Sequence, residues 1–442
     1  MSGGWLRLKL RKSAGDVDRA VRFMIRHAAR HVPFYRDAWH LAGVRPSEIR
    51  GAADLPRLPL TAREDLLLSG AARFLHGDAG HRRLVSQHTT GTTGTPVVVH
   101  MSRVEARFRT LTLLDSFRRN AKLALPMTIV DVGPQQKDRA TRPVLRAGLV
   151  TVVRLFSSTP LEEQIDILQR HRPTLIEGRP STLWALAKGL QVQGIRPHRP
   201  KLLVSFAEVL FPHVRTLLGE VFDCRVVDYY NCEEVGNLAW ECPLHPDTMH
   251  VNTSTAWVEV VGANGEPLPY GAIGEVVVTN LYNATMPFVR YALRDRASLL
   301  EPALCACGYE GPSMRLLEGR DEDFFVLPDG REISPRAVYA ILNGALPVGG
   351  IGGVLARSLL GLQIVQESSD LVVVRVIPGP EYAESIWAQF EHDLLGLCPS
   401  LRVQVRCVDS LESGTPGTKF RSILSCVHGP WQALRMGEAA DD

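Results

Sequence analysis

The chain has 442 residues, a formal net charge of +3, 45% hydrophobic residues and 22% charged residues. This balance is typical of a folded protein with more than one domain, and no basic stripe suggests a nucleic-acid partner. No apolar run approaches the roughly 18 to 20 residues of a membrane helix, and the start, MSGGWLRLKLRKSAG, lacks the core and cleavage site of a signal peptide. We therefore expect a cytoplasmic protein with no membrane partner.

The first half of the chain alternates between helical and strand patterns. Apolar positions at helical spacing run from Val17 to Trp39, and Ala52–Ser69 predicts a proline-punctuated loop followed by a short helix. Further along, strands are predicted at Met127–Val132, Leu149–Leu155, Thr174–Glu177, Lys201–Ser205 and Arg225–Tyr229, with helices at Pro160–Arg170, Ser181–Gln193 and Pro212–Glu220. This alternation indicates an α/β fold with a largely parallel sheet.

The pattern changes twice in the second half. From Val258 onward, alternating strands separated by glycine-rich turns predict a smaller β subdomain. Near Gly319–Asp323 the character shifts again, and the remaining ~120 residues are typical of a compact α+β unit. No internal repeat is visible.

A threonine- and glycine-rich loop, QHTTGTTGTP from Gln87 to Pro96, precedes the apolar run Val97–Val99. Such a loop can point successive backbone N–H groups and hydroxyls into one concavity, which suits phosphate oxygens. It is not a Walker loop, because no Gly-Lys-Ser/Thr follows. The alternative is a solvated polar turn, and the loop alone does not decide between the two.

Further motifs follow this loop in a fixed order. They are Ala207-Glu208, YYNCEEVG (Tyr229–Gly236), RYALRD (Arg290–Asp295), EGRDED (Glu318–Asp323) and GTPGTKFRSILS (Gly414–Ser425). Together with HVPFYRDAW (His31–Trp39) and HRPTLIEGRPSTL (His171–Leu183), the set resembles the adenylate-forming ligase superfamily, in particular its phenylacetate–CoA ligase branch. The resemblance covers nearly the whole chain.

The resemblance implies a large N-terminal α/β domain, residues 1–321, with a β subdomain, and a small mobile C-terminal α+β domain, residues 322–442. Glu322, with Asp323, would be the hinge between them. The N-terminal domain would bind ATP, with Ala207 and Glu208 at the adenine edge, Tyr230 stacked near the nucleotide and Asp295 on the ribose hydroxyls. The β,γ-phosphates would lie on Thr89, Thr90, Gly91, Thr92, Thr93 and Gly94.

The same resemblance implies three catalytic residues. Glu234 would bind Mg²⁺, Arg320 would lie near the ribose, and Lys419 of the last domain would reach the α-phosphate and the carboxylate. A carboxylate that attacks phosphorus brings two negative charges together, so a metal and a lysine offset the repulsion. Each residue also has a structural alternative: an Asp295–Arg320 ion pair, a solvated Lys419, or a helix-terminal Glu234.

The implied function is ATP-dependent activation of a carboxylic acid, aryl or arylacetic, to an acyl-adenylate with pyrophosphate release. The acyl group would then pass to CoA, to a carrier-protein thiol or to an amine of a secondary metabolite. One alternative is adenylyl transfer to a hydroxyl-bearing cofactor or metabolite, and another is a degenerate, non-catalytic binding protein. We expect the acid pocket along Asp131–Gln136 and Arg179–Ser181; the acid itself and the oligomeric state are not predicted.

Two departures from the branch's usual motifs bear on activity. The metal motif usually reads Tyr-Gly-x-Ser/Thr-Glu, whereas here Asn231 and Glu233 stand at the changed positions, and Thr95 replaces a lysine of the phosphate loop. These changes could weaken ATP binding or retune it, and they motivate the non-catalytic alternative.

The cysteines form a second constellation. Cys242, Cys305 and Cys307 with His250 supply three thiols and one imidazole, the ligand set of a closed, tetrahedral structural zinc site. His245 is an alternative fourth ligand, and reduced loop cysteines are the alternative to a metal site. Relatives with a similar cysteine and histidine pattern support the zinc interpretation.

Overall fold

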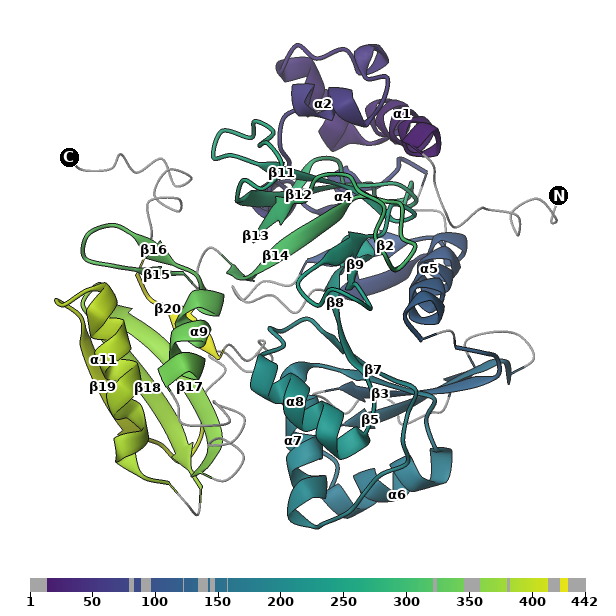
Figure 1. Ribbon diagram of the computed structural model, residues 1–442. Helices are drawn as coiled ribbons and strands as arrows, with labels where there is room; N and C mark the ends of the chain where they lie inside the picture. The colour runs from purple at the N-terminus through teal and green to yellow at the C-terminus, as the bar shows by residue number, and fades with distance from the viewer. Residues whose placement is uncertain are drawn as a thin grey trace. The chain divides into compact units, whose positions relative to one another are not determined.

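The computed structural model describes residues 14–78, 83–88, 97–121, 123–133, 142–143, 148–156, 158–320, 324–345, 358–379, 382–411 and 422–427. The chain folds into two compact units, Met1–Lys122 with Tyr229–Leu316, and Leu123–Asp228 with Leu317–Asp442. Figure 1 traces their elements in chain order. Among the described helices, none is both long and apolar enough to span a bilayer.

The first unit begins with two helices, α1 (Ala14–His31) and α2 (Pro33–Leu41). The helical pattern predicted from Val17 to Trp39 is thus divided, because Pro33 cannot donate the backbone bond that would continue α1 and instead starts α2. Tyr35 and Trp39 are buried on α2. Four short elements follow: η2 (Pro46–Glu48), η3 (Ala52–Arg57), α3 (Arg63–Ser69) and α4 (Ala71–Phe74).

Antiparallel strands and one long helix make up most of the rest of the first unit. β1 (Val85–His88) pairs with β2 (Val98–Met101), and α5 (Arg103–Ala121) follows. The larger sheet has the order β11-β12-β13-β14-β10-β9, next to β8. Its strands are β8 (Val226–Cys232), β9 (Gly236–Glu241), β10 (Met249–Val251), β11 (Ala256–Val261), β12 (Gly274–Asn280), β13 (Tyr291–Leu299) and β14 (Ser313–Arg320). The predicted change to alternating strands near Val258 is confirmed.

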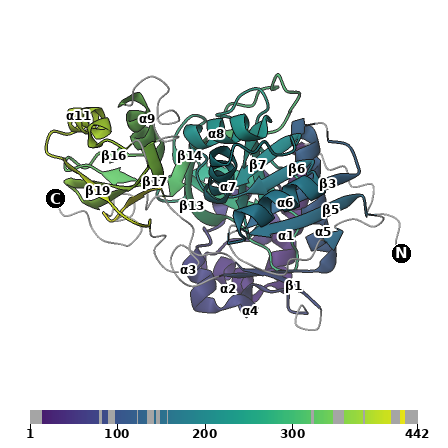
Figure 2. The same ribbon diagram turned by 90° about the horizontal axis from the view of Figure 1, so that it is seen from below.

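The second unit contains the predicted parallel sheet. β3 (Met127–Gly133) pairs in parallel with β5 (Val150–Phe156) and β6 (Leu175–Gly178), and β6 with β7 (Leu202–Phe206); the short β4 (Arg142–Pro143) pairs antiparallel to β5. The covering helices are α6 (Leu161–His171), α7 (Pro180–Val192) and α8 (Pro212–Phe222). Figure 2 shows them packed along this sheet. All predicted strands and helices of this region are confirmed to within a few residues.

The C-terminal residues of the second unit form a separate small sheet of order β19-β18-β17-β20. Its strands are β17 (Leu359–Ser368), β18 (Leu371–Pro378), β19 (Arg402–Cys407) and β20 (Ile423–Ser425). Two helices, α9 (Pro335–Ala345) and α11 (Ala388–Leu397), lie side by side on one face of this sheet (Figure 1). A short hairpin, β15 (Phe325–Val326) with β16 (Glu332–Ile333), precedes α9, and η7 (Glu384–Trp387) precedes α11. The predicted α+β character is confirmed.

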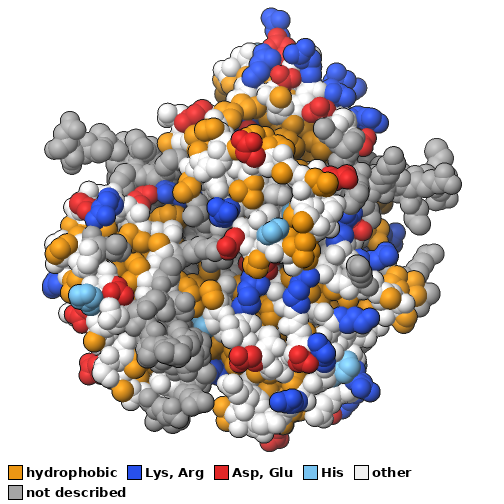
Figure 3. All heavy atoms as spheres, viewed as in Figure 1, with side chains coloured by type: hydrophobic (Ala, Val, Ile, Leu, Met, Phe, Trp, Pro, Cys, Tyr) orange, Lys and Arg blue, Asp and Glu red, His pale blue; other side chains and the backbone are white. Residues whose placement is uncertain are grey.

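Charged side chains of both signs are interspersed over the face drawn in Figure 3, with a denser group of Lys and Arg over α1 and α2. Three arginines of the first helices are paired with acids: Arg19 on α1 with Asp16, and Arg36 on α2 and Arg73 on α4 with Asp37. Exposed pairs of this kind contribute little to stability. They do offset part of the positive charge of these helices.

Candidate active site

The predicted metal and nucleotide motif lies on the hairpin formed by β8 and β9. β8 ends at Cys232, the turn holds Glu233 to Val235, and β9 begins at Gly236, with Cys232 directly opposite Gly236. Because side chains alternate along a strand, Tyr229 and Tyr230 point to opposite faces of β8. Tyr229 is buried and its hydroxyl accepts a bond from Asn120 on α5, which leaves the other face of β8 for Tyr230.

Tyr230 contacts the predicted ribose-binding residue. Its hydroxyl donates a hydrogen bond of 2.5 Å to Oδ2 of Asp295, which lies on β13. Bonds to an ionised carboxylate are shorter and stronger than neutral ones. The structure therefore brings Tyr230 and Asp295 together, although the two residues are 65 positions apart.

Glu234 has a tyrosine contact of its own. The hydroxyl of Tyr291, the first residue of β13, donates to Oε1 of Glu234 at 3.2 Å. Only 7% of Glu234 is exposed. β13 thus contacts the β8–β9 hairpin through Tyr291 and through Asp295. Together the hairpin and β13 bring four polar side chains into two pairs, Tyr230 with Asp295 and Tyr291 with Glu234.

The charge on Glu234 affects its neighbours. Burial raises the pKa of the Tyr291 hydroxyl, and the Glu234 carboxylate raises it further. The same two causes, in the same order, raise the pKa of the Cys232 thiol well above its usual range. Cys232 is therefore a protonated thiol at neutral pH, and Tyr291 remains a hydrogen-bond donor to Glu234.

Arg109 on α5 is a site residue that the sequence analysis missed. Its guanidinium donates to the backbone carbonyl of Glu233 at 2.7 Å and to Oε2 of Glu233 at 2.9 Å. Nothing in the arginine-rich sequence of α5 distinguishes Arg109 from its neighbours. The contact distinguishes the two glutamates of the motif: Glu233 pairs with an arginine, whereas Glu234 contacts a tyrosine.

Gly236 fits against the same arginine. Its φ is +95°, and a Cβ at this position would lie 2.9 Å from Nε of Arg109. We expect Gly236→Ala to lower the free energy of unfolding by about 2 to 3 kcal/mol, because a positive φ costs an L-residue ~1 to 2 kcal/mol and Arg109 must also shift. Chemical denaturation measures this loss.

Gly271→Ala is the matched control for this prediction. Gly271 has a similar φ of +82° and nothing within 4 Å of a Cβ, so its substitution reports the backbone cost alone. Equal losses in the two variants would show that the close approach to Arg109 is without consequence.

The predicted adenine-edge residues follow β7 in the second unit. Ala207 has a φ of +70°, a conformation that L-residues rarely adopt. The Glu208 carboxylate accepts a bond of 3.1 Å from the Ser181 backbone N–H, at the start of α7, and lies 4.0 Å from Arg179. Glu208 thus accepts a bond from one of the backbone N–H groups that have no partner within α7. Its side chain therefore caps the N-terminus of this helix.

Part of the predicted acid pocket contains three ionisable side chains on neighbouring strands. Asp131 on β3 is the direct neighbour of Glu177 on β6 and of Arg154 on β5, whose Nε lies 3.7 Å from Oδ2 of Asp131. Burial raises the pKa of both carboxyl groups, and Asp131 raises that of Glu177 further. Of the other predicted pocket residues, Pro134–Gln136 lie outside the described residues, whereas Arg179 and Ser181 contact Glu208 as stated above.

Several predicted site residues lie outside the described residues. They are the phosphate loop, Thr89, Thr90, Gly91, Thr92, Thr93 and Gly94, together with Thr95, Glu322, Asp323 and Lys419. Arg320 is the last residue of β14. The strands on either side of the predicted phosphate loop are described. β1 precedes the loop and β2 follows it, and the two strands pair antiparallel with His88 opposite Val98. The strand predicted after the loop is therefore confirmed.

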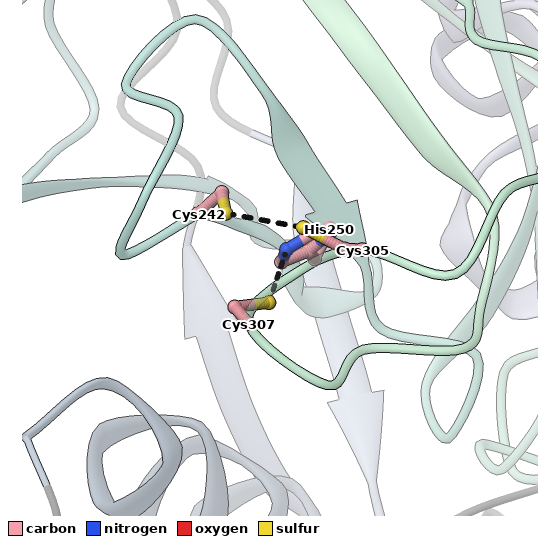
Figure 4. A group of neighbouring side chains, drawn as sticks. All are labelled: Cys242, His250, Cys305 and Cys307. Carbon is pink, nitrogen blue, oxygen red and sulfur yellow. Dashed lines mark hydrogen bonds between the residues drawn. The ribbon is translucent and has the colours of Figure 1, made fainter.

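The cysteine constellation is assembled as predicted (Figure 4). One ligand atom from each of Cys242, His250, Cys305 and Cys307 lies within 4.8 Å of the other three. The Sγ atoms of Cys242 and Cys305 are 3.5 Å apart, and Nε2 of His250 is 3.1 Å from Sγ of Cys307. His245, the alternative ligand, is exposed in the β9–β10 turn and is not part of this group.

The orientation of the His250 ring is compatible with metal binding. Its Nδ1 lies 2.9 Å from the Ser313 hydroxyl, and a bond at Nδ1 leaves the Nε2 lone pair for a cation. Burial lowers the pKa of His250 to about 4, with His245 adding to the effect, so the ring is neutral at pH 7. A donor set of three thiols and one neutral imidazole fits Zn²⁺.

The fold places the chain in a known structural class. It matches the crystal structure of 2-hydroxyisobutyryl-CoA ligase in the postadenylation state with R3-HIB-AMP, with a TM-score of 0.76 and 19% identity, over 97% of this chain and 92% of that one. The same ligase with 2-HIB-AMP and CoA in the thioesterification state gives a TM-score of 0.61 at 22% identity, with the same coverage. The chain therefore has the fold of the adenylate-forming acyl-CoA ligases.

Sequence relatives narrow this class. The chain is 27% identical to the phenylacetate-coenzyme A ligase of Aromatoleum evansii over 326 residues, 70% of each chain, and 28% identical to that of Thermus thermophilus over 335 residues, 72% of each chain. The ligase of Escherichia coli is 25% identical over 329 residues. No family model matches the chain. The chain is thus a homologue of the phenylacetate–CoA ligases, and the predicted resemblance is confirmed.

Proposed function

We propose that the protein is an ATP-dependent acid–CoA ligase that acts on an aryl or arylacetic acid. In the first step a carboxylate oxygen of the acid attacks the α-phosphorus of ATP and pyrophosphate leaves. In the second step the sulfur of CoA attacks the acyl carbonyl, AMP leaves and the thiol proton passes to solvent. The similarity to phenylacetate-coenzyme A ligases over 70% of the chain supports this activity.

The single structural observation that carries the proposal is the double tyrosine–carboxylate arrangement. Tyr230 orients Asp295 and Tyr291 orients Glu234, so two carboxylates from one unit are fixed by hydrogen bonds. We assign Asp295 to the ribose hydroxyls, as hydrogen-bond acceptor, and Glu234 to Mg²⁺, since carboxylate oxygens are preferred ligands of this ion. Mg²⁺ supplies charge neutralisation at the triphosphate when bound.

The departures in the metal motif do not disrupt this arrangement. Asn231 receives a bond of 2.9 Å from the Asn237 amide, and Glu233 is neutralised by Arg109. Because Glu233 is paired with a cation, its extra carboxylate need not compete with Glu234 for Mg²⁺. This observation favours a functional site over a degenerate, non-catalytic one.

Zn²⁺ is the second proposed metal. Cys242, His250, Cys305 and Cys307 would hold it with four protein ligands and no open position, so its role would be structural. The group joins the end of β9, strand β10 and the loop between β13 and β14. It would therefore fix the strands on both sides of β10 within the first unit.

Pyrophosphate exchange tests the proposed activity before any acceptor is known. Exchange should depend on Mg²⁺ and on an acid from a panel led by phenylacetate, and mass analysis with CoA should give the acyl-CoA and AMP. Carrier-protein thiols and amines are the other acceptors to include. An adenylylated metabolite in place of an acyl-CoA would establish adenylyl transfer instead, and no exchange together with no ATP binding would establish the non-catalytic alternative.

Lys419 and Glu322 separate the two half-reactions. We propose that Lys419, on the small C-terminal domain of residues 322–442, contacts the reacting phosphate only during adenylation. Lys419→Ala should then slow adenylation on the order of 10²-fold, the effect of removing one transition-state charge stabiliser, and spare acyl transfer from supplied acyl-adenylate. Glu322→Pro should do the reverse, because proline fixes φ at a hinge that must rotate.

Both half-reactions are measured in both variants. A Lys419→Ala protein that loses the two steps equally, or a Glu322→Pro protein that keeps both, would contradict domain alternation and the division at residues 321 and 322.

A further inference from the structure

Three histidines of the first unit converge at a place remote in sequence from the proposed catalytic motifs. They are His27 and His31 on α1 and His76, which follows α4; one ring nitrogen of each lies within 4.8 Å of the others. The ring centroids are 5.0 Å apart for His27 and His31, 5.1 Å for His27 and His76, and 4.6 Å for His31 and His76. All three side chains are partly buried.

The backbone fixes this cluster. His27 and His31 are four positions apart, so they lie one above the other on the same face of α1. The backbone N–H of His76 donates to the carbonyl of Thr285 at 2.9 Å, and that of Gly77 donates to the carbonyl of His31 at 3.0 Å. One main-chain bond therefore joins the segment of His76 to the C-terminal end of α1, and the other joins it to the loop at Thr285.

The ring of His27 is oriented by a further contact. Its Nε2 lies 2.8 Å from the carbonyl oxygen of Ala284, and donation from Nε2 leaves a lone pair on Nδ1. The loop that carries this carbonyl is itself fixed, because Glu105 accepts bonds from the backbone N–H groups of Ala284 and Thr285 and from the Thr285 hydroxyl. A histidine ligand whose other nitrogen donates to a backbone carbonyl is typical of metal sites.

We propose that His27, His31 and His76 form a second metal site, which binds one divalent transition-metal cation such as Zn²⁺ through three imidazoles. Imidazole suits Zn²⁺, Cu²⁺ and Ni²⁺ but not Mg²⁺ or Ca²⁺. Ligand nitrogens around a tetrahedral Zn²⁺ are about 3.3 Å apart, so small side-chain rotations close the cluster. His76 would give up the bond that its Nδ1 accepts from Asp78, whose exposed N–H can bond to water instead.

The proposed site differs in kind from the cysteine group. Three imidazoles leave a fourth position open for water or a small ligand, and they carry no thiolate. An ion there would connect α1, the segment after α4 and the loop at residues 284–285, which leads into β13 with Tyr291 and Asp295. Occupancy should raise the melting temperature, because any ligand that binds only the folded chain stabilises it.

Metal titration of the full-length protein tests this site. After chelation and dialysis, at a pH above the ordinary pKa of about 6.5 for imidazole, the wild type should bind two equivalents of Zn²⁺, one at each group. His27→Gln, His31→Gln and His76→Gln should each weaken the second equivalent by at least about 10-fold, since even indirect ligand partners contribute that much. His40→Gln, an exposed histidine on α2, is the matched control.

Cobalt spectra assign each equivalent to its group. With Co²⁺, the thiolate charge-transfer band should persist in the three histidine variants and disappear in Cys305→Ser with Cys307→Ser. The second equivalent, which has no thiolate ligand, should be weakened in the histidine variants and should persist in Cys305→Ser with Cys307→Ser. A wild type whose only bound Co²⁺ shows the thiolate band, with no equivalent that depends on the histidines, would overturn the proposal. So would a second equivalent that survives unchanged in the histidine variants, all three of which should give the wild-type circular dichroism spectrum.

Discussion

Glu234→Ala is expected to slow acid-dependent pyrophosphate exchange on the order of 10³-fold, the upper range for loss of a transition-state charge stabiliser. Glu234 is 93% buried and is fixed by the Tyr291 hydroxyl, so its carboxylate is held in place before ATP arrives. Without it, the Mg²⁺ proposed to offset the triphosphate charge would lose its protein ligand. Exchange at saturating ATP over a range of Mg²⁺ concentrations measures the effect, and the Mg²⁺ requirement should rise.

Glu233→Ala is the matched control for this prediction. Glu233 is adjacent in sequence but paired with Arg109, so its loss should reduce exchange by less than about 10-fold, the cost of one partly exposed charge-assisted bond. A large loss in Glu233→Ala together with an active Glu234→Ala would transfer the metal role to Glu233.

Removing two ligands of the cysteine group should have the largest effect on stability. We expect Cys305→Ser with Cys307→Ser to lower the free energy of unfolding by at least about 4 kcal/mol, because binding to a closed site contributes directly to folding. For a unit of this size the corresponding fall in melting temperature is roughly 10 °C. Elemental analysis should show that one equivalent of zinc is lost, and scanning calorimetry measures the shift.

A second double variant controls for the loss of thiols. Cys407 and Cys426 are free, exposed cysteines, so Cys407→Ser with Cys426→Ser should leave both the zinc content and the melting temperature unchanged. ATP affinity should change less than stability in the ligand variant, because Cys305 and Cys307 make no contact with Tyr230, Asp295 or Glu234 among the described interactions. A metal-free wild type of equal stability would contradict the zinc assignment.

The sequence predicted the elements of the second unit well. Runs such as Leu202–Phe206 are short, apolar and bounded by turn residues. Parallel strands are covered on both faces, so they are continuous apolar segments that the sequence makes visible. The division between α1 and α2 was not predicted, because apolar spacing continues through Val32, although Pro33 is a visible signal. Local patterns therefore fixed element types more reliably than element ends.

The candidate site was predicted only in part. The order of the motifs predicted Tyr230, Glu234 and Asp295, and the cysteine and histidine types predicted a candidate metal group, whose four side chains the structure brings together. Arg109 and Tyr291 were missed, because the first lies on a helix with many arginines and the second contacts Glu234 across 57 positions. Neither pairing leaves a local signal in the sequence.

The amino-acid sequence by itself determined the α/β and α+β regions, the resemblance to the phenylacetate–CoA ligases and the residue types of both sites, because these depend on local periodicity and on the order of short motifs. Only the tertiary structure decided that His250 and not His245 joins the cysteines, that Glu233 pairs with Arg109, and that His27, His31 and His76 meet. The physical reason is that strand pairing and helix packing bring together residues far apart in the chain, and the side chains themselves carry no record of those partners.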